Sequence, residues 1–166
     1  MRNIVLIGFM GTGKTTVSEQ LGRMSGMDIF DMDAMIALRQ NLSIPEIFEQ
    51  YGEAYFRDLE TSLLIELQSK ENLIISCGGG VVLREQNVVE MKKSGTVVLL
   101  TAAPETIYQR VKDCQDRPLL QGRNHVDGIS ELMEMRKEKY EAAADITIAT
   151  DHKSVEEICK EILNMM

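Results

Sequence analysis

The segment that most restricts the fold of this chain is Gly8–Thr15, which reads Gly-Phe-Met-Gly-Thr-Gly-Lys-Thr. It matches the pattern G-x-x-x-x-G-K-[ST] in full and directly follows the apolar run Ile4–Ile7. When such a loop joins a buried strand to a helix, its backbone N–H groups surround a phosphate chain, and the N-terminus of the helix adds positive charge. A chance glycine-rich turn is the alternative, but the position between a predicted strand and a predicted helix argues against it.

The loop predicts a nucleoside triphosphate and Mg²⁺ as ligands. Lys14 is expected to reach the β- and γ-phosphates, and the Thr15 hydroxyl to bind Mg²⁺. Kinase, ATPase and GTPase remain open from the loop alone. A GTPase would be expected to carry N-K-x-D, which the nearest segment, Asn124–Asp127, lacks. Since 166 residues leave little room for a motor domain, a small-molecule kinase fits best.

Short apolar runs alternate with longer amphipathic stretches along the chain. The runs predict strands buried on both faces, at Ile4–Ile7, Leu73–Ser76, Thr96–Leu100 and Ile146–Ala149, with a weaker one at Met27–Phe30. Helical patterns cover 14–24, 54–69, 88–93, 104–112 and 130–144, and capping boxes at Ser43 and Ser154 open two more helices. Alternating strands and helices predict an α/β fold with a parallel sheet, in a single domain over 1–166.

The charge balance limits the partners. The chain has 18 basic and 26 acidic residues, a formal net charge of −8, and so no broad basic surface for nucleic acid or an anionic membrane. A small anion in a locally positive cleft stays possible. The 3 cysteines are far apart and the 2 histidines lack metal-ligand spacing, so neither a disulfide framework nor a zinc site is expected. The first apolar run is too short for a signal-peptide core, and a cytoplasmic protein is expected.

Residues that end the strands are candidates for the site, because parallel sheets bind ligands beyond the carboxyl ends of their strands. The run Met27–Phe30 leads into Asp31 and Asp33, whose carboxylates would share one face in extended chain. They could hold Mg²⁺ through water or accept a hydroxyl proton. The alternative is an acidic helix start with Asp33 as its N-cap.

A glycine triplet, Gly78-Gly79-Gly80, follows the run Leu73–Ser76 and Cys77. Three glycines leave backbone N–H groups open to a ligand and let it approach closely, although a plain turn into the next helix is the alternative. No acidic residue ends this strand, so Asp31 is the better Mg²⁺ candidate.

Three arginines complete the candidate site. Arg57 and Glu60 are three residues apart, so on a helix Glu60 could hold the guanidinium for a carboxylate ligand. A surface ion pair is the alternative. The polar segment 112–124 suits a mobile lid whose Arg117 folds over the triphosphate, or else a solvated loop. Arg136 lies on a predicted helix, where a solvated face is the alternative.

These segments together resemble the shikimate kinase family, nearly over the whole chain and in order. The phosphate loop is shared by many families, whereas Phe-Arg-x-x-Glu, the glycine triplet and Arg-Pro-Leu-Leu are more specific. The resemblance rests on Gly8–Thr15, Asp31-Met32-Asp33, Phe56-Arg57 with Glu60, Gly78-Gly79-Gly80, Arg117-Pro118-Leu119-Leu120, and Arg136 with Tyr140.

The resemblance implies a three-layer P-loop kinase fold, with a five-stranded parallel sheet of order 2-3-1-4-5 flanked by helices. It implies a mobile lid at about 112–124 and a substrate-binding subregion at about 33–60. The implied reaction transfers the γ-phosphoryl group of ATP to the 3-hydroxyl of shikimate. The products are shikimate 3-phosphate and ADP, in chorismate and aromatic amino-acid biosynthesis, and a monomer is expected.

The resemblance also implies a role for each matching residue. Asp33 contacts the attacking hydroxyl, either as its base or as an orienting group, and Asp31 holds Mg²⁺ through water beside Thr15. Catalysis is implied for Asp33, Lys14 and Arg117. Shikimate binding is implied for Asp33, Arg57, Gly78, Gly79, Gly80 and Arg136. ATP binding is implied for Gly11, Thr12, Gly13, Lys14, Thr15, Thr16, Arg110 and Arg117, with the adenine at Thr150–Lys153.

Two rivals and one departure remain. Another small-molecule kinase of this fold, acting on gluconate or a nucleotide, is the nearest rival, although Arg57, Glu60 and the glycine triplet favour shikimate. A regulatory module that only binds ATP is the second, but it would not need a second set of arginines. The departure is the adenine loop Ala149–Lys153, which lacks a proline seen in some relatives.

Overall fold

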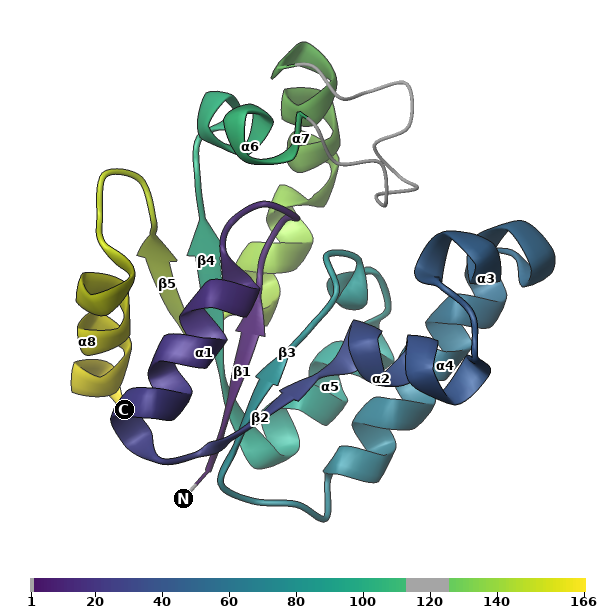
Figure 1. The fold of residues 1–166 in the computed structure, drawn as a ribbon, viewed down its shortest axis with the longest axis horizontal. Helices are drawn as coiled ribbons and strands as arrows, with labels where there is room; N and C mark the ends of the chain where they lie inside the picture. The colour runs from purple at the N-terminus through teal and green to yellow at the C-terminus, as the bar shows by residue number, and fades with distance from the viewer. Residues whose placement is uncertain (1, 113–125) are drawn as a thin grey trace.

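The computed structural model describes residues 2–112 and 126–166. Their parallel strands form one sheet in the order β2-β3-β1-β4-β5, which is the expected order (Figure 1). In the centre, Ile4 of β1 pairs with Ile74 of β3 on one side and with Thr96 of β4 on the other. The strands are β1 Asn3–Ile7, β2 Asp28–Asp31, β3 Leu73–Ser76, β4 Gly95–Thr101 and β5 Ile146–Ala149.

The helices follow the predicted pattern, with differences at their ends. A 3₁₀ turn, η1, stands directly after the glycine triplet, where only a turn or a helix start was expected. α7 already includes Val126, whereas the pattern indicated a start at Ser130. The helices are α1 Lys14–Ser25, α2 Met32–Gln40, α3 Ile44–Tyr51, α4 Glu53–Leu67, η1 Val81–Leu83, α5 Glu85–Ser94, α6 Pro104–Val111, α7 Val126–Ala143 and α8 Val155–Met165.

Both faces of the sheet are covered in its centre, which explains why β1 is buried along its whole length, whereas the edge strand β2 is partly exposed and begins and ends with an aspartate. Successive side chains of β1 point to opposite faces. Val5 and Ile7 join the larger apolar cluster with α4, α5 and α7, while Ile4 and Leu6 join the smaller one with α1 and α8. Figure 1 shows α1 and α8 on one side of the sheet and α5 on the other. The result is the three-layer arrangement that the sequence predicted.

Local signals at the helix starts place the site residues. Gly13 precedes α1 with a φ of 95°, a left-handed conformation that glycine adopts without strain. Asp31 caps α2, because its side chain accepts a hydrogen bond from the backbone N–H of Ala34. The alternative in which Asp33 is this cap is therefore wrong, since Asp33 lies inside the first turn of α2. The predicted capping box at Ser43 is present and opens α3.

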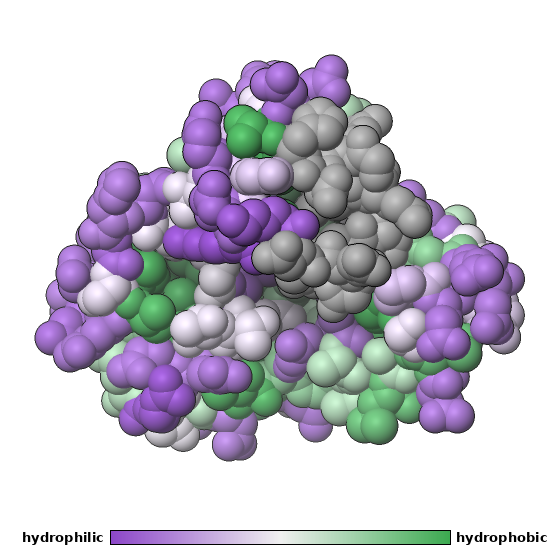
Figure 2. All heavy atoms as spheres, turned by 45° about the horizontal axis from the view of Figure 1, so that its top comes forward, coloured by the Kyte–Doolittle hydropathy of each residue, from purple (hydrophilic) through white to green (hydrophobic). Residues whose placement is uncertain are grey.

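Figure 2 shows the face toward which the strands point; its described residues are mostly hydrophilic, with hydrophobic residues gathered in a few places. Within residues 2–112 and 126–166, no helix is both long and apolar enough to cross a lipid bilayer.

Candidate active site

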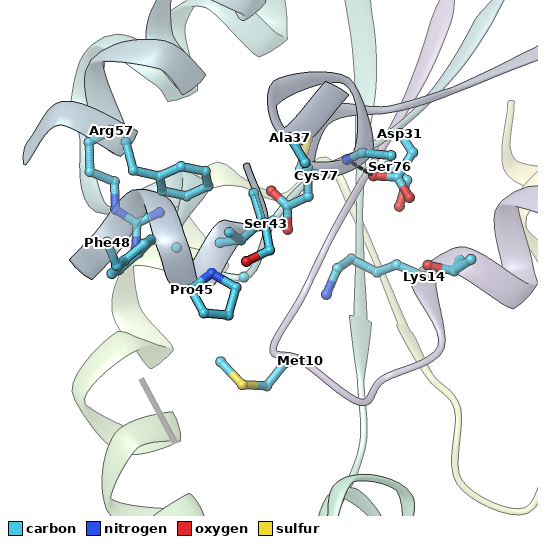
Figure 3. A pocket seen from close by; sticks show the side chains of 18 residues that line it. Met10, Lys14, Asp31, Ala37, Ser43, Pro45, Phe48, Arg57, Ser76 and Cys77 are labelled. Atoms are coloured by element: carbon cyan, nitrogen blue, oxygen red, sulfur yellow. Dashed lines mark hydrogen bonds between the residues drawn. The ribbon is translucent and has the colours of Figure 1, made fainter. Parts of the chain in front are cut away.

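A cavity of about 370 Å³ lies where β1, β2 and β3 end. Four separate segments line it: the phosphate loop, the start of α2, the α3–α4 region and the glycine triplet. Figure 3 shows Lys14 and Arg57 reaching into it from opposite sides. The fold brings together the following predicted site residues at this cavity: Lys14, Thr15, Asp31, Asp33, Arg57, Gly78, Gly79 and Gly80.

The phosphate loop holds its own cation in place. The Lys14 ammonium donates hydrogen bonds to the carbonyl oxygens of Gly8, at 2.7 Å, and of Phe9, at 3.1 Å. The Thr12 hydroxyl is buried and donates to the Phe9 carbonyl at 2.8 Å, so this side chain stabilises the loop from within. The charge of Lys14 therefore stands at the loop, at the end of the central strand.

Arg110 reaches the phosphate loop from α6. Its Nη1 donates to the Gly11 carbonyl at 2.9 Å and lies 3.5 Å from the Thr150 hydroxyl. The structure thus joins the phosphate loop to Thr150, the first residue of the expected adenine loop. In that loop, Asp151 accepts hydrogen bonds from the Ala103 backbone and the Thr106 hydroxyl.

Arg57 is buried within α4 and is held by two carboxylates. Its Nη1 lies 2.8 Å from Glu60 Oε1, and its Nη2 lies 3.1 Å from Glu53 Oε2. Only 6% of the residue is exposed. Burial alone would lower the pKa of Arg57, but the attraction of Glu60 and Glu53 raises it above its ordinary value. The alternative of a surface ion pair is wrong, because Glu60 is fully buried and Arg57 is exposed only where it lines the cavity.

Glu60 is the unusual member of this pair. Its carboxyl group is fully buried, and its Oε2 has no hydrogen-bond partner among the described residues. Burial raises the pKa of Glu60 to about 7, with a further upward effect of the charge on Asp33, against the opposing attraction of Arg57. Burial therefore favours the protonated form of this carboxyl group, whereas the neighbouring Arg57, which lines the cavity, favours the ionised form.

The glycine triplet lies directly against the Arg57 guanidinium. A Cβ atom on Gly80 would fall 2.3 Å from Arg57 Nη2, so no other residue fits there without moving the arginine. The alternative of a plain turn does not explain Gly80, because a side chain there would collide with the Arg57 guanidinium.

α7 contacts the triplet through Tyr140 and Arg136. The Tyr140 hydroxyl donates to the Gly79 carbonyl, and burial raises the pKa of Tyr140, so the phenol keeps its proton. Arg136 is 5% exposed, and its Nη1 is buried without a hydrogen-bond partner among the described residues. That nitrogen lies 3.7 Å from the place of a Cβ on Gly79. The solvated-face alternative for Arg136 is therefore wrong.

Part of the predicted site lies outside the described residues, and some contacts of the cavity were not predicted. Apart from Lys112, the expected lid at 112–124 with its Arg117 lies outside the described residues. Sequence reasoning missed Glu53, although its position four residues before Arg57 on one helix was a usable signal. The apolar wall of the cavity lies within the phosphate loop and the expected substrate-binding subregion 33–60, but no role in binding was expected for its side chains: Met10, Ile44, Pro45, Phe48 and Phe56.

The phosphate loop at the end of the central strand of a 2-3-1-4-5 parallel sheet defines the class, a P-loop kinase fold. The family model described as "Shikimate kinase" matches residues 10–166. The chain therefore belongs to the shikimate kinase family.

Relatives agree over nearly the whole length. The chain is 41% identical over 163 residues to a shikimate kinase of Caldanaerobacter subterraneus, covering 98% of this chain and 95% of that protein. It is 45% identical over 161 residues to one from Geobacter sulfurreducens, covering 97% of this chain and 88% of the relative.

Solved structures agree as well. A shikimate kinase from Acinetobacter baumannii in complex with shikimate superposes with a TM-score of 0.94 at 36% identity, over 99% of this chain and 92% of that one. A gluconokinase from Sinorhizobium meliloti matches with a TM-score of 0.58 at 14% identity, over 98% of this chain and 90% of that one, and so shares the fold alone.

Proposed function

We propose that this chain transfers the γ-phosphoryl group of ATP to the 3-hydroxyl of shikimate, which gives shikimate 3-phosphate and ADP. This is a step of chorismate and aromatic amino-acid biosynthesis. Full-length relatives that are shikimate kinases, and a similar structure that contains shikimate, support the proposal.

One observation carries it: a phosphate loop and a buried arginine line the same cavity. Lys14 and Thr15 stand on the loop, and Arg57 stands on α4. A triphosphate on the loop and a carboxylate on the arginine would place two anionic substrates in one cleft. Phosphoryl transfer depends mostly on positioning and on charge stabilisation, which these cations supply.

The substrate carboxylate is assigned to Arg57 and Arg136. Arg57 is oriented by Glu53 and Glu60, so its guanidinium loses little freedom on binding. Arg136 has a buried Nη1 without a hydrogen-bond partner among the described residues, which a ligand oxygen would satisfy. Gly78, Gly79 and Gly80 would bring backbone N–H groups to the same ligand. Arg110 and Arg117 are assigned to ATP.

Mg²⁺ is assigned to Thr15 and Asp31, the latter through water. A hydroxyl and a carboxylate in one cavity fit a hard cation that prefers oxygen ligands. Within the described residues no group of three or more His, Cys, Asp or Glu side chains could hold a metal. An ion that keeps several waters and binds the substrate phosphates needs only one or two protein ligands. When bound, Mg²⁺ neutralises charge on those phosphates.

Asp33 is assigned to the attacking hydroxyl, because it lines the cavity together with Lys14 and Arg57. Its carboxylate would accept the hydroxyl's hydrogen bond and so aim the oxygen at the γ-phosphorus. Whether it also removes the proton early is open, since a loose transition state needs little activation of the nucleophile.

Action as a cytoplasmic monomer, without nucleic acid or membrane, stays a prediction.

The decisive experiment measures ADP formation from ATP and Mg²⁺ in three parallel reactions, with shikimate, gluconate or a nucleoside monophosphate. The expected result is ADP release only with shikimate. Release with gluconate or the nucleotide instead would favour the rival kinases. ATP binding without release in any arm would favour a regulatory module.

A further inference from the structure

Arg57 and the glycine triplet meet in the cavity but come from different elements, α4 and the loop after β3. A Cβ added to Gly80 would lie only 2.3 Å from Arg57 Nη2, so the Gly80 backbone and the guanidinium are already close. A shift of a few tenths of an ångström between α4 and the loop would therefore change how these two groups approach each other. Something must fix α4 relative to the loop. The hydrogen bonds of Asn87 and Thr61, neither of which lines the cavity, do this.

Asn87 lies in the first turn of α5 and is completely buried. Its side-chain amide donates to the Val81 carbonyl at 2.9 Å, and its Oδ1 lies 2.7 Å from the Thr61 hydroxyl. Val81 directly follows Gly80 and begins η1, whose Leu83 N–H donates back to the Gly80 carbonyl. One asparagine thus joins the end of the glycine triplet to α4.

Thr61 carries the connection to the arginine. It stands one residue after Glu60 on α4, and its hydroxyl also lies 3.1 Å from the Arg57 carbonyl. Of the two acceptors, Asn87 Oδ1 is nearer to the hydroxyl than the Arg57 carbonyl. Arg84 Nη1 stands 3.4 Å from the same hydroxyl oxygen, as a donor. The residue is 7% exposed, so water does not compete for these bonds.

We propose that Asn87 and Thr61 are positioning residues that set the distance between Arg57 and the glycine triplet, and so control the affinity for the carboxylate substrate. This rests on the proposed function of the cavity. Neither side chain would touch substrate, and neither is hydrogen-bonded to the phosphate loop. The pair should therefore affect shikimate and leave ATP alone.

Thr61→Val is the main test, because it keeps the shape of the side chain and removes only the hydroxyl. The KM for shikimate should rise about threefold to tenfold, which corresponds to the net loss of one or two hydrogen bonds. The KM for ATP should stay within about twofold on the same scale. Thr61→Ser, which keeps the hydroxyl, should restore most of the affinity.

Asn87→Ala should also raise the KM for shikimate. The double variant should raise this KM by less than the product of the two single effects, because both changes remove the same connection.

Asn3 provides a matched control. It is another fully buried asparagine, and its side chain bonds the Lys70 carbonyl at 3.0 Å and the Leu73 N–H at 2.9 Å, where β1 and β3 begin. Asn3→Ala should lower the unfolding temperature without changing the KM for shikimate. If Thr61→Val likewise lowers the unfolding temperature and leaves that KM unchanged, or raises both KM values equally, the proposal is overturned.

A second readout does not depend on turnover. Hydrogen exchange of the backbone segment 78–83 should be faster in Thr61→Val than in the wild type, while exchange of 8–15 stays the same. Unchanged exchange at 78–83 would overturn the positioning role, whatever the substrate. Absence of shikimate-dependent ADP release by the wild type would instead reject the proposed function, and the exchange result would still decide on Asn87 and Thr61.

Discussion

Arg57 and Arg136 are both buried arginines beside the glycine triplet, but their partners differ. Arg57 is held by two carboxylates, whereas Arg136 keeps an Nη1 without a hydrogen-bond partner among the described residues. A buried donor without a partner costs free energy until a ligand satisfies it.

Arg136→Met tests this directly, because it keeps the apolar stem and removes the guanidinium. A lost charge-assisted contact is worth about 1.5–3 kcal/mol, so the KM for shikimate should rise roughly tenfold to hundredfold. Steady-state kinetics with each substrate varied in turn measures this. Arg39→Met is the matched control, since Arg39 pairs with Glu66 on the surface and should leave both KM values unchanged. A change confined to the KM for ATP would contradict the assignment.

Asp33→Asn should lower kcat and leave the fold intact. The amide has nearly the same shape but lacks the charge with which the carboxylate orients the hydroxyl; where the group also takes the proton, the loss is worth about 10²–10⁴ in rate. A kcat measurement with saturating substrates, together with thermal unfolding, separates chemistry from stability. Asp28→Asn on the exposed edge strand is the control. Near-normal turnover would remove Asp33 from the reaction.

Glu60 makes stability depend on pH in an unusual direction. Because burial raises the pKa of Glu60 from 4.5 to about 7, the folded state binds a proton that the unfolded state has released between these values. Stability therefore falls as the pH rises through that window. Glu60→Gln cannot titrate, so its free energy of unfolding should fall less between pH 5 and pH 7.5. Denaturant unfolding of both proteins at several pH values measures this, and parallel curves would show that Glu60 does not titrate there.

At the scale of elements, the sequence predicts more about the strands than about the site. Continuous apolar runs and capping residues have local physical causes, so β3, β5 and the capping box of Ser43 occur where the pattern indicated. Burial of Arg57 depends on which elements pack over α4, which spacing along one helix does not encode. The burial of Arg136 likewise depends on packing between elements, whereas the polar face of its helix indicated exposure to solvent. The bond from Tyr140 to Gly79 joins residues 61 positions apart and leaves no local signal.

The loop between β3 and η1 offers a prediction at this scale. Gly80→Ala would push a methyl group into the Arg57 guanidinium, so the KM for shikimate should rise while the KM for ATP holds. At Gly79 the nearest atom to an added Cβ stands 3.5 Å away, an ordinary contact, so Gly79→Ala should have a much smaller effect. Kinetics of the two variants side by side decide the matter. If both variants raise the KM for shikimate equally, the close approach of Gly80 to Arg57 does not determine the affinity.

At the scale of the molecule, ligand binding should stabilise the fold through the phosphate loop. A ligand at 100 times its Kd adds about 2.7 kcal/mol, which for a domain of this size raises the unfolding temperature by roughly 5–10 °C. Thermal unfolding with ATP and Mg²⁺ should show this increase, and chelation of Mg²⁺ should reduce it. Lys14→Met should abolish it. An equal increase in that variant would place the nucleotide away from the loop.

The strand order has a consequence for synthesis of the chain on the ribosome. β1 leaves the ribosome first, yet its neighbours in the sheet are β3 and β4, whose Ile74 and Thr96 pair with Ile4. At about 5–20 residues per second, the first strand waits several seconds for the second of these neighbours. Until then β1, which leads into the glycine-rich segment, can pair with a neighbouring strand on one side only, through β3. The earliest strand of the sheet thus gains both of its neighbours only after β4 has been made.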